Sequence, residues 1–321
     1  MIVCHLIVLF PADMKVIQII RVGAAARHNA FTGMTQLNNR LWLVYREGAA
    51  HVSPDGAIRV LCSDDGLHWD SAARIAEPGK DLRDPKICRT PDGRLMLLAA
   101  AVERPKGTTM RLANRVWFSR DGQDWGQAYP VGEPNLWLWR VTWQGQRAWG
   151  VAYSVGDHQG KPRFVRLYLS YDGIHFTPQG SEIFSGGYPN EHAMIFTGGT
   201  GWCLLRCDDQ RKTAMLGRSI GPSQHWEWRP LGVLLGGPQM LAIGLHQAWV
   251  GARLYDGQIR TSLCRLDLST ASLTEVLTLP SGGDTSYPDM LWHGERLLLS
   301  YYSAHEGKCC VYVAHIAPAL T

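Results

Sequence analysis

Short hydrophobic runs of strand length, separated by polar turns, recur along the whole chain. Three of them read AIRVLC (57–62), RLANRVWF (111–118) and RFVRLYL (163–169). No segment shows the 3.6-residue periodicity of a long amphipathic helix. Apolar runs of this length, bounded by Gly, Pro, Asp and Ser, are typical of strands. The pattern therefore predicts an all-β protein.

Each of these three runs is followed by the same turn signal. SDDGLHW begins at Ser63, SRDGQDW at Ser119 and SYDGIHF at Ser170. The Asp-Gly pair predicts a tight turn with a positive φ at Gly, and the Asp carboxylate can accept hydrogen bonds from the N–H groups of the turn. The signal recurs at intervals of roughly fifty residues, which indicates stacked or radial supersecondary units.

The repeat divides the chain into six units. Their approximate ranges are 27–75, 83–130, 135–182, 188–232, 237–280 and 284–316. The fourth turn, GRSIGPSQHWEW (217–228), keeps the spacing but lacks the Asp. The run KVIQIIRV (15–22) is left over and can complete the last sheet, which would close a ring. We predict a single six-bladed β-propeller over 15–321, with five blades as the alternative because the fifth unit has no turn motif.

Composition and charge narrow the class of protein. The 321 residues are 45% hydrophobic and 19% charged, which is a globular composition, and the 13 Trp and 34 Gly suit an all-β fold with tight turns. The net charge of +4 comes from scattered basic residues, so we expect no nucleic-acid partner. No run is long enough to span a membrane, and no membrane partner is expected.

The N-terminus and the cysteines bear on location. Residues 1–14 form an extension or a weak signal segment, because the apolar run lacks a basic start and an A-x-A-like cleavage site. The eight Cys include no C-x-x-C pair, so we expect mostly free, buried thiols. This favours the cytoplasm, with a secreted or periplasmic location as the alternative. Nothing indicates the oligomeric state.

The repeated Ser-x-Asp-Gly-x-x-aromatic turn resembles the Asp-box (BNR repeat) of sialidases, or neuraminidases, and their relatives. The resemblance implies a six-bladed propeller whose catalytic residues lie at the central axis, while the turns lie at the periphery of the blades. The turns therefore mark the fold, and the function must come from residues that point to the axis.

Four residues in the last three units resemble the catalytic half of a sialidase. They are Glu191, Arg206, Arg253 and Tyr287, in that order. The resemblance implies a Tyr287 nucleophile activated by Glu191, with the arginines binding the substrate carboxylate. A neutral tyrosine avoids the repulsion that a carboxylate nucleophile would meet beside an acidic anomeric centre. The guanidinium groups match a carboxylate bidentately.

The first unit departs from the sialidase pattern. Where the family has Arg-Ile-Pro, this chain has RHNAFTG, which offers Arg27 alone. The general acid, an Asp in the family, would fall near VYREGAAHVSPDG, whose candidates are Arg46, Glu47, His51 and Asp55. Glu47 or His51 could protonate a leaving group. Asp55 belongs to a Pro-Asp-Gly turn, and Arg27, Arg46 and His51 are candidates for substrate binding.

The stretch KDLRDPKI (80–87) carries one more candidate, Asp84. Its Asp-Pro resembles a substrate-binding Asp-Pro of sialidases, and its Arg-Asp-Pro also resembles a motif of five-bladed fructosidases and arabinosidases. That second class needs an Asp nucleophile in the first blade, and residues 27–33 contain none. In either case we expect Asp84 to face the axis and to take part in catalysis or substrate binding.

Four histidines fall near predicted inner positions: His28, His51, His192 and His305. Their spacing matches no known metal-ligand pattern, so no metal or other cofactor is predicted. We expect His51 and His192 to bind substrate hydroxyls. No phosphate loop, nucleotide fingerprint or Ser-His-Asp pattern is visible.

Three functions remain open. The first is a retaining exo-glycosidase for an acidic sugar such as sialic acid, a related keto-sugar acid or a uronic acid. The second is a propeller that only binds glycans or a protein. The third is a fructosidase- or arabinosidase-like glycosidase. We favour the first because Glu191, Asp84 and Glu47 together exceed the carboxylates that binding alone requires.

Overall fold

In the part of the chain that the computed structural model describes, all regular secondary structure is β-strand. The structure describes residues 13–106, 110–155, 160, 162–220 and 225–319. Within these ranges there is no helix with the length and apolar character needed to cross a membrane.

The strands are short and evenly distributed along the chain. In chain order they are β1 (Met14–Gly23), β2 (His28–Leu37), β3 (Arg40–Gly48), β4 (Ala57–Ser63), β5 (Asp70–Ile75), β6 (Asp81–Arg89), β7 (Leu95–Glu103), β8 (Arg111–Ser119), β9 (Tyr129–Val131), β10 (Leu136–Gln144), β11 (Arg147–Ser154), β12 (Phe164–Ser170), β13 (Thr177–Ser185), β14 (Pro189–Thr197), β15 (Thr200–Cys207), β16 (Met215–Ile220), β17 (Trp226–Pro230), β18 (Leu235–Ala242), β19 (Gln247–Leu254), β20 (Arg260–Asp267), β21 (Ser272–Thr278), β22 (Thr285–His293), β23 (Arg296–Ser303) and β24 (Cys310–Pro318).

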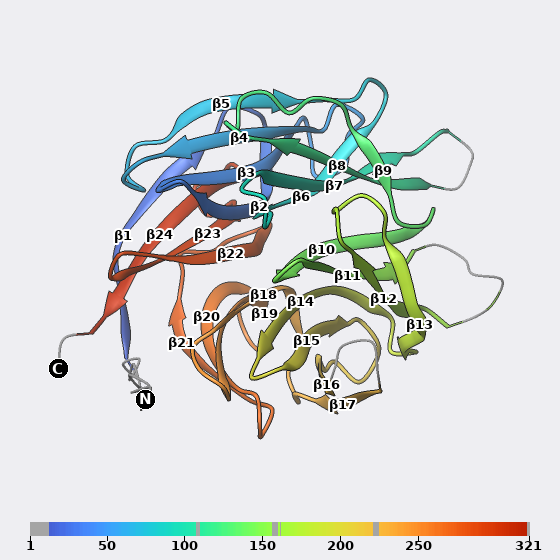
Figure 1. The fold of residues 1–321 in the computed structure, drawn as a ribbon. Helices are drawn as coiled ribbons and strands as arrows, with labels where there is room; N and C mark the ends of the chain where they lie inside the picture. The colour runs from blue at the N-terminus through green and yellow to red at the C-terminus, as the bar shows by residue number, and fades with distance from the viewer. Residues whose placement is uncertain (1–12, 107–109, 156–159, 161, 221–224, 320–321) are drawn as a thin grey trace, which may run out of the picture.

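These strands form six four-stranded antiparallel sheets arranged around a central axis (Figure 1). Five sheets are consecutive meanders, beginning at β2, β6, β10, β14 and β18. The sixth has the order β1-β24-β23-β22, so the N-terminal strand completes the last blade, with Met14 opposite Pro318. The prediction of six blades closed by residues 15–22 is confirmed, and the five-bladed alternative is wrong. The closure pairs the two ends of the chain and protects the last sheet.

The three repeated turns occupy equivalent places, each between the third and fourth strand of a blade. In the first, the Ser63 hydroxyl accepts a hydrogen bond from Gly66 N at 2.8 Å, and Asp65 Oδ1 accepts one from Leu67 N at 2.7 Å. Trp69 donates its indole N–H to the Gly66 carbonyl. The turns at Ser119 and Ser170 repeat the Ser and Asp contacts. Residues 221–224 of the predicted fourth turn lie outside the described residues.

Apolar side chains of neighbouring sheets fill the spaces between blades. Leu204 of β15 and Val250 of β19 are both fully buried in one such cluster, and Val44 of β3 and Leu97 of β7 in another. The cysteines that the structure describes are free thiols, mostly buried. This packing fixes the blades against one another and leaves the first strand of each blade facing the axis.

Candidate active site

Bulges in the first strands of the blades position side chains at the axis. The pairing of β2, β6, β10, β14, β18 and β22 with the next strand is irregular in every blade. At three of these bulges a non-glycine residue has a left-handed backbone, with φ of 64° at Phe31, 51° at Asp84 and 46° at Tyr287. Pro85 and Pro288 follow two of them, and Pro is tolerated at a bulge because it needs no ladder hydrogen bond. Non-glycine residues in this region cost about 1–3 kcal/mol each and cluster at functional sites.

Tyr287 and Glu191, from blades six and four, meet at the axis. The Tyr287 hydroxyl donates a hydrogen bond of 2.5 Å to Glu191 Oε1. Burial raises the pKa of Tyr287 well above its usual value, and the Glu191 carboxylate raises it further, although Arg206 opposes the shift. The resting phenol is therefore neutral, and its proton already points at a carboxylate that can accept it.

Aromatic rings hold Tyr287 in place. Its ring lies 5.3 Å from Phe31 and 5.5 Å from Trp139, and it stacks on Tyr302 at 5.9 Å. The Thr32 hydroxyl donates to the Tyr287 carbonyl at 2.8 Å. These contacts come from blades one, three and six, so the strained backbone at Tyr287 is fixed from several sides.

Arg206 neutralises the carboxylate of Glu191. Its Nη1 donates to both Glu191 oxygens, at 2.8 and 3.2 Å, and its Nε donates to Asp208 at 2.7 Å. Glu191 and Arg206 lie on β14 and β15, side by side in one blade. The guanidinium group thus holds the buried carboxylate in contact with the Tyr287 hydroxyl.

Arg253 also lies close to Tyr287, with its guanidinium carbon 5.6 Å from the centroid of the ring. It donates only to neutral oxygens, namely the Thr285 carbonyl at 2.6 Å and the hydroxyls of Tyr302 and Tyr255 at 3.2 and 3.4 Å. Among the described residues its carboxylate partner is Asp284, which is 3.9 Å away. Its positive charge is therefore incompletely paired and available to an anionic ligand.

Asp84 is brought to the same centre. It is buried, and its Oδ2 lies 3.9 Å from Arg83 Nε. Burial raises the pKa of Asp84; Arg83 and Lys86 oppose that shift, and the nearby Glu191 carboxylate adds to it. Two carboxyl groups in unequal environments thus face the axis, and such a pair can divide acid and base roles.

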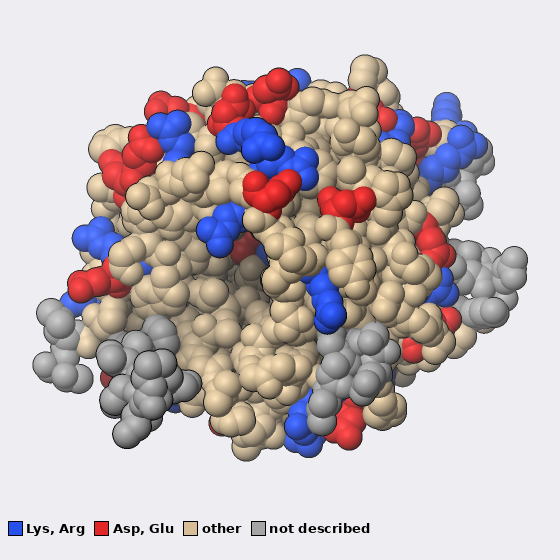
Figure 2. All heavy atoms as spheres, in the orientation of Figure 1, with Lys and Arg blue, Asp and Glu red and all other residues tan. Residues whose placement is uncertain are grey.

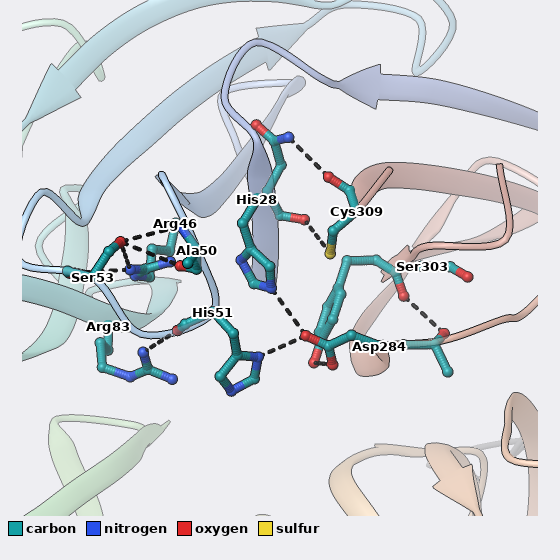
Figure 3. Close-up of polar contacts among 12 residues, drawn as sticks. His28, Arg46, Ala50, His51, Ser53, Arg83, Asp284, Ser303 and Cys309 are labelled. Atoms are coloured by element: carbon teal, nitrogen blue, oxygen red, sulfur yellow. Dashed lines mark hydrogen bonds and ion pairs between the residues drawn. The ribbon is translucent and has the colours of Figure 1, made fainter. Parts of the chain in front are cut away.

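Two of the predicted histidines form a cluster with an aspartate that precedes β22. Figure 3 shows His28 and His51 pointing at Asp284, whose Oδ2 lies 2.9 Å from His28 Nε2 and 2.6 Å from His51 Nδ1. Tyr302 donates to the other oxygen, Oδ1, at 3.0 Å. The three ligand atoms lie within 4.8 Å of one another, a spacing that also suits a metal ion. Because both rings bond directly to one oxygen and Arg253 lies 3.9 Å from the other, we interpret the cluster as a hydrogen-bond network.

Other residues predicted for the site lie elsewhere. Glu47, on the second strand of blade one, accepts hydrogen bonds from Arg59 at 3.0 Å and Arg74 at 2.6 Å. Arg46, on the same strand, is fully buried and donates to Asp81 at 2.6 Å. These ion pairs commit both side chains to partners other than Tyr287 and Glu191.

The remaining predicted side chains are also apart from the Tyr287–Glu191 pair. His192 is fully buried, both ring nitrogens lack a hydrogen-bond partner among the described residues, and burial lowers its pKa to about 3. Arg27 is exposed just before β2. His305 accepts or donates a hydrogen bond at Ser303 Oγ, 3.0 Å away.

Sequence reasoning missed Asp284, Phe31 and Tyr302. Asp284 lies only three residues before Tyr287, so its position beside a predicted nucleophile was a usable signal. Phe31 lies at the bulge of the first blade, in the place that Asp84 and Tyr287 hold in theirs. Recognising it requires the register of the bulge, which hydrophobic periodicity does not reveal.

Another group of polar side chains lies on the same inner strands, further along the chain than the bulges. Lys86 Nζ donates to the Thr32 carbonyl at 2.9 Å, and Asp289 accepts hydrogen bonds from Arg140 at 3.0 Å and Gln239 at 2.6 Å. Lys86, Arg140, Gln239 and Asp289 line a cavity of about 500 Å³ whose lining includes neither Tyr287 nor Glu191. The face shown in Figure 2 is hollowed near its middle, with much of its charge toward the edge.

Replacing Lys86 with methionine is expected to change how stability depends on pH. Burial, aided by Arg140, lowers the pKa of Lys86 to about 7, whereas an unfolded lysine titrates near pH 10.4. Between these values the unfolded chain binds a proton that the folded chain does not. The free energy of unfolding of the wild type should therefore rise, relative to the variant, by about 1.4 kcal/mol per pH unit.

Urea unfolding of both proteins at about pH 7 and about pH 9 measures this difference. Lys15→Met, at an exposed position on β1, controls for loss of a surface charge and should show no such slope. A Lys86→Met difference that is constant with pH would contradict the depressed pKa.

Comparisons with known proteins agree on the fold. Neither a protein-family model nor a curated protein matches the chain. A protein of unknown function from Dyadobacter fermentans is 17% identical, with a TM-score of 0.79 over 96% of this chain and all of its own. The sialidase of Trypanosoma rangeli is 11% identical, with a TM-score of 0.67 over 95% of this chain and 60% of that one. The α-L-arabinanase of Penicillium chrysogenum is 13% identical, with a TM-score of 0.71 over 93% and 98%.

Proposed function

We propose that this chain, whose fold is that of the sialidase-like propellers, is a retaining exo-glycosidase for an acidic sugar. One observation carries the proposal: the Tyr287 hydroxyl donates a 2.5 Å hydrogen bond to Glu191 at the axis. Among solved structures with this fold are glycoside hydrolases, a sialidase and an arabinanase.

In the proposed reaction Tyr287 is the nucleophile and Glu191 its base. As the phenolic oxygen attacks the anomeric carbon, the phenolic proton passes to Glu191, and a glycosyl-tyrosine forms. Water then cleaves that bond, Tyr287 regains its proton and the product keeps the anomeric configuration of the substrate. Arg206 stays bonded to Glu191 and lies close enough to stabilise the developing phenolate.

Arg253 and Arg206 support an acidic substrate. The two guanidinium groups lie near one tyrosine ring, and the charge of Arg253 is only partly paired. A carboxylate attached to the anomeric carbon, as in a 2-keto sugar acid, would accept charged hydrogen bonds from these donors in a buried site. Tyrosine rather than a carboxylate as nucleophile fits the same substrate, because it brings no negative charge to the anomeric centre.

A second candidate is an exo-glycosidase for a neutral arabinose unit. The observation in its favour is Asp84, whose buried carboxyl faces the axis near Glu191. Asp84 and Glu191 would then be the two carboxyl groups of an ordinary glycosidase. The similarity to the arabinanase is as high as that to the sialidase.

A panel of fluorogenic glycosides separates these candidates. It should contain glycosides of sialic acid, an octulosonic acid, two uronic acids and arabinofuranose. We expect release from an acidic glycoside. Release from the arabinofuranoside alone would favour the second candidate. No release from any of them, with retained binding of the sugars, would favour a binding propeller.

A further inference from the structure

The Tyr287–Glu191 pair accounts for the nucleophile and its base, but a glycosidase also needs a group that protonates the leaving oxygen. Glu47 is held by Arg59 and Arg74 and does not contact the pair among the described residues. Asp84 faces the axis, but it is only 6% exposed. In an exo-acting enzyme the leaving group points out of the site, so its acid must lie nearer the solvent.

His51 meets that requirement. Its side chain is 50% exposed, and its ring packs edge-to-face with Phe31 at 5.3 Å, while Phe31 packs in the same way with Tyr287, also at 5.3 Å. His51 also lies near enough to Asp84 to lower the pKa of that carboxyl. The half-exposed imidazole is thus one aromatic ring away from Tyr287 and reaches the solvent.

Asp284 orients this ring. The 2.6 Å hydrogen bond to Asp284 occupies Nδ1, and no described residue bonds to Nε2. The His51 carbonyl accepts a hydrogen bond from Arg83, which fixes the backbone of its loop (Figure 3). Asp284 is itself held by His28 and Tyr302. A carboxylate bonded to Nδ1 orients the ring and leaves Nε2 as the nitrogen that can exchange a proton with the substrate, as an aspartate does for a catalytic histidine.

We propose that His51 is the general acid and base of this site, with Asp284 as its positioning residue. The proposal rests on the proposed glycosidase function. It places a His–Asp dyad where the related enzymes are expected to use a single Asp.

The proton balance is complete. In the first step the His51 Nε2 proton moves to the glycosidic oxygen while the bond from that oxygen to the anomeric carbon breaks and the Tyr287 oxygen bonds to the same carbon. The Tyr287 proton goes to Glu191. In the second step neutral His51 takes a proton from water as the water oxygen displaces Tyr287, which regains its proton from Glu191.

Leaving-group dependence tests the role. For His51→Ala, kcat/KM with an alkyl glycoside, whose leaving oxygen needs a proton, should fall by about 10²- to 10⁴-fold. With a nitrophenyl glycoside of the same sugar, whose leaving group needs none, the fall should be far smaller. Azide, a nucleophile that needs no base, should then raise kcat of the variant and give a glycosyl azide of retained configuration.

Two variants serve as comparisons. Asp84→Asn and Tyr287→Phe should each lower kcat/KM for both glycosides by similar factors, without azide rescue. If His51→Ala lowers both equally while the wild type is active, the His51 assignment is wrong and the proposed function stands. If Asp84→Asn shows the leaving-group dependence instead, Asp84 is the acid. A wild type that cleaves no glycoside overturns the proposed function and this inference with it.

Asp284→Asn tests the positioning role. Loss of the carboxylate removes the partner that orients the His51 ring through Nδ1, so kcat/KM with the alkyl glycoside should fall much more than kcat/KM with the nitrophenyl glycoside. Equal falls for the two glycosides would contradict the dyad, as would activity that is lost in EDTA and restored by zinc or manganese.

Discussion

Tyr287→Phe is expected to abolish turnover, by about 10⁴-fold or more in kcat, while substrate binding changes little. The change removes the hydroxyl that donates to Glu191 and leaves a ring that still packs against Phe31, Trp139 and Tyr302. The measurement is kcat with the best glycoside of the panel, together with the Kd of its product.

The matched control is Tyr301→Phe. Tyr301 is also a buried tyrosine of the last blade, but its hydroxyl has no hydrogen-bond partner among the described residues and its ring contacts Tyr312. This control should keep wild-type kcat. Near-normal turnover in Tyr287→Phe would show that the nucleophile lies elsewhere, and Asp84 would be the next residue to replace.

Arg253→Ala is expected to weaken the binding of an acidic sugar about 10- to 100-fold, because a charged hydrogen-bond partner of its carboxylate is lost. The same change should have little effect on the uncharged methyl ester of that sugar. Calorimetric titration with 2,3-didehydro sialic acid and its methyl ester measures both. Equal losses for acid and ester would refute carboxylate recognition.

Arg206→Ala should also bind the acidic sugar no better than its methyl ester, and in addition its free energy of unfolding should be lower than that of the wild type. Arg206 bonds to both oxygens of buried Glu191, and removing one partner of a buried ion pair costs about 3–5 kcal/mol. Among the described residues Arg253 has no hydrogen-bonded carboxylate partner, only Asp284 at 3.9 Å, which makes its variant the cleaner test of recognition. An Arg206→Ala protein with the wild-type free energy of unfolding would contradict this second expectation and would show that the Arg206–Glu191 ion pair does not stabilise the fold.

The fold was predictable because its signals are local and repeat. Asp-Gly turns and strand-length apolar runs recur in phase, and the unpaired run at 15–22 had one sheet left to complete. Proximity in the sequence has one limit. His192 follows Glu191 directly, yet it is fully buried and neither of its ring nitrogens bonds to a described residue.

The members of the candidate site that could be predicted lie on the first and second strands of the blades. Glu191 and Tyr287 are on first strands and Arg206 is on a second strand, and the structure brings the three together. Arg46 and Glu47 also lie on a second strand, but they form ion pairs with other residues there. The place of Asp284 depends on two histidines far away in sequence, which no local pattern relates.

Rapid acid quenching during turnover of a nitrophenyl glycoside, followed by peptide mass mapping, tests the central claim most directly. The account predicts a glycosyl adduct on the peptide that contains Tyr287, with fragment ions that place it on the tyrosine itself. An adduct on the peptide of Asp84 or Glu191, or an inverted product with no adduct on any peptide, would contradict it.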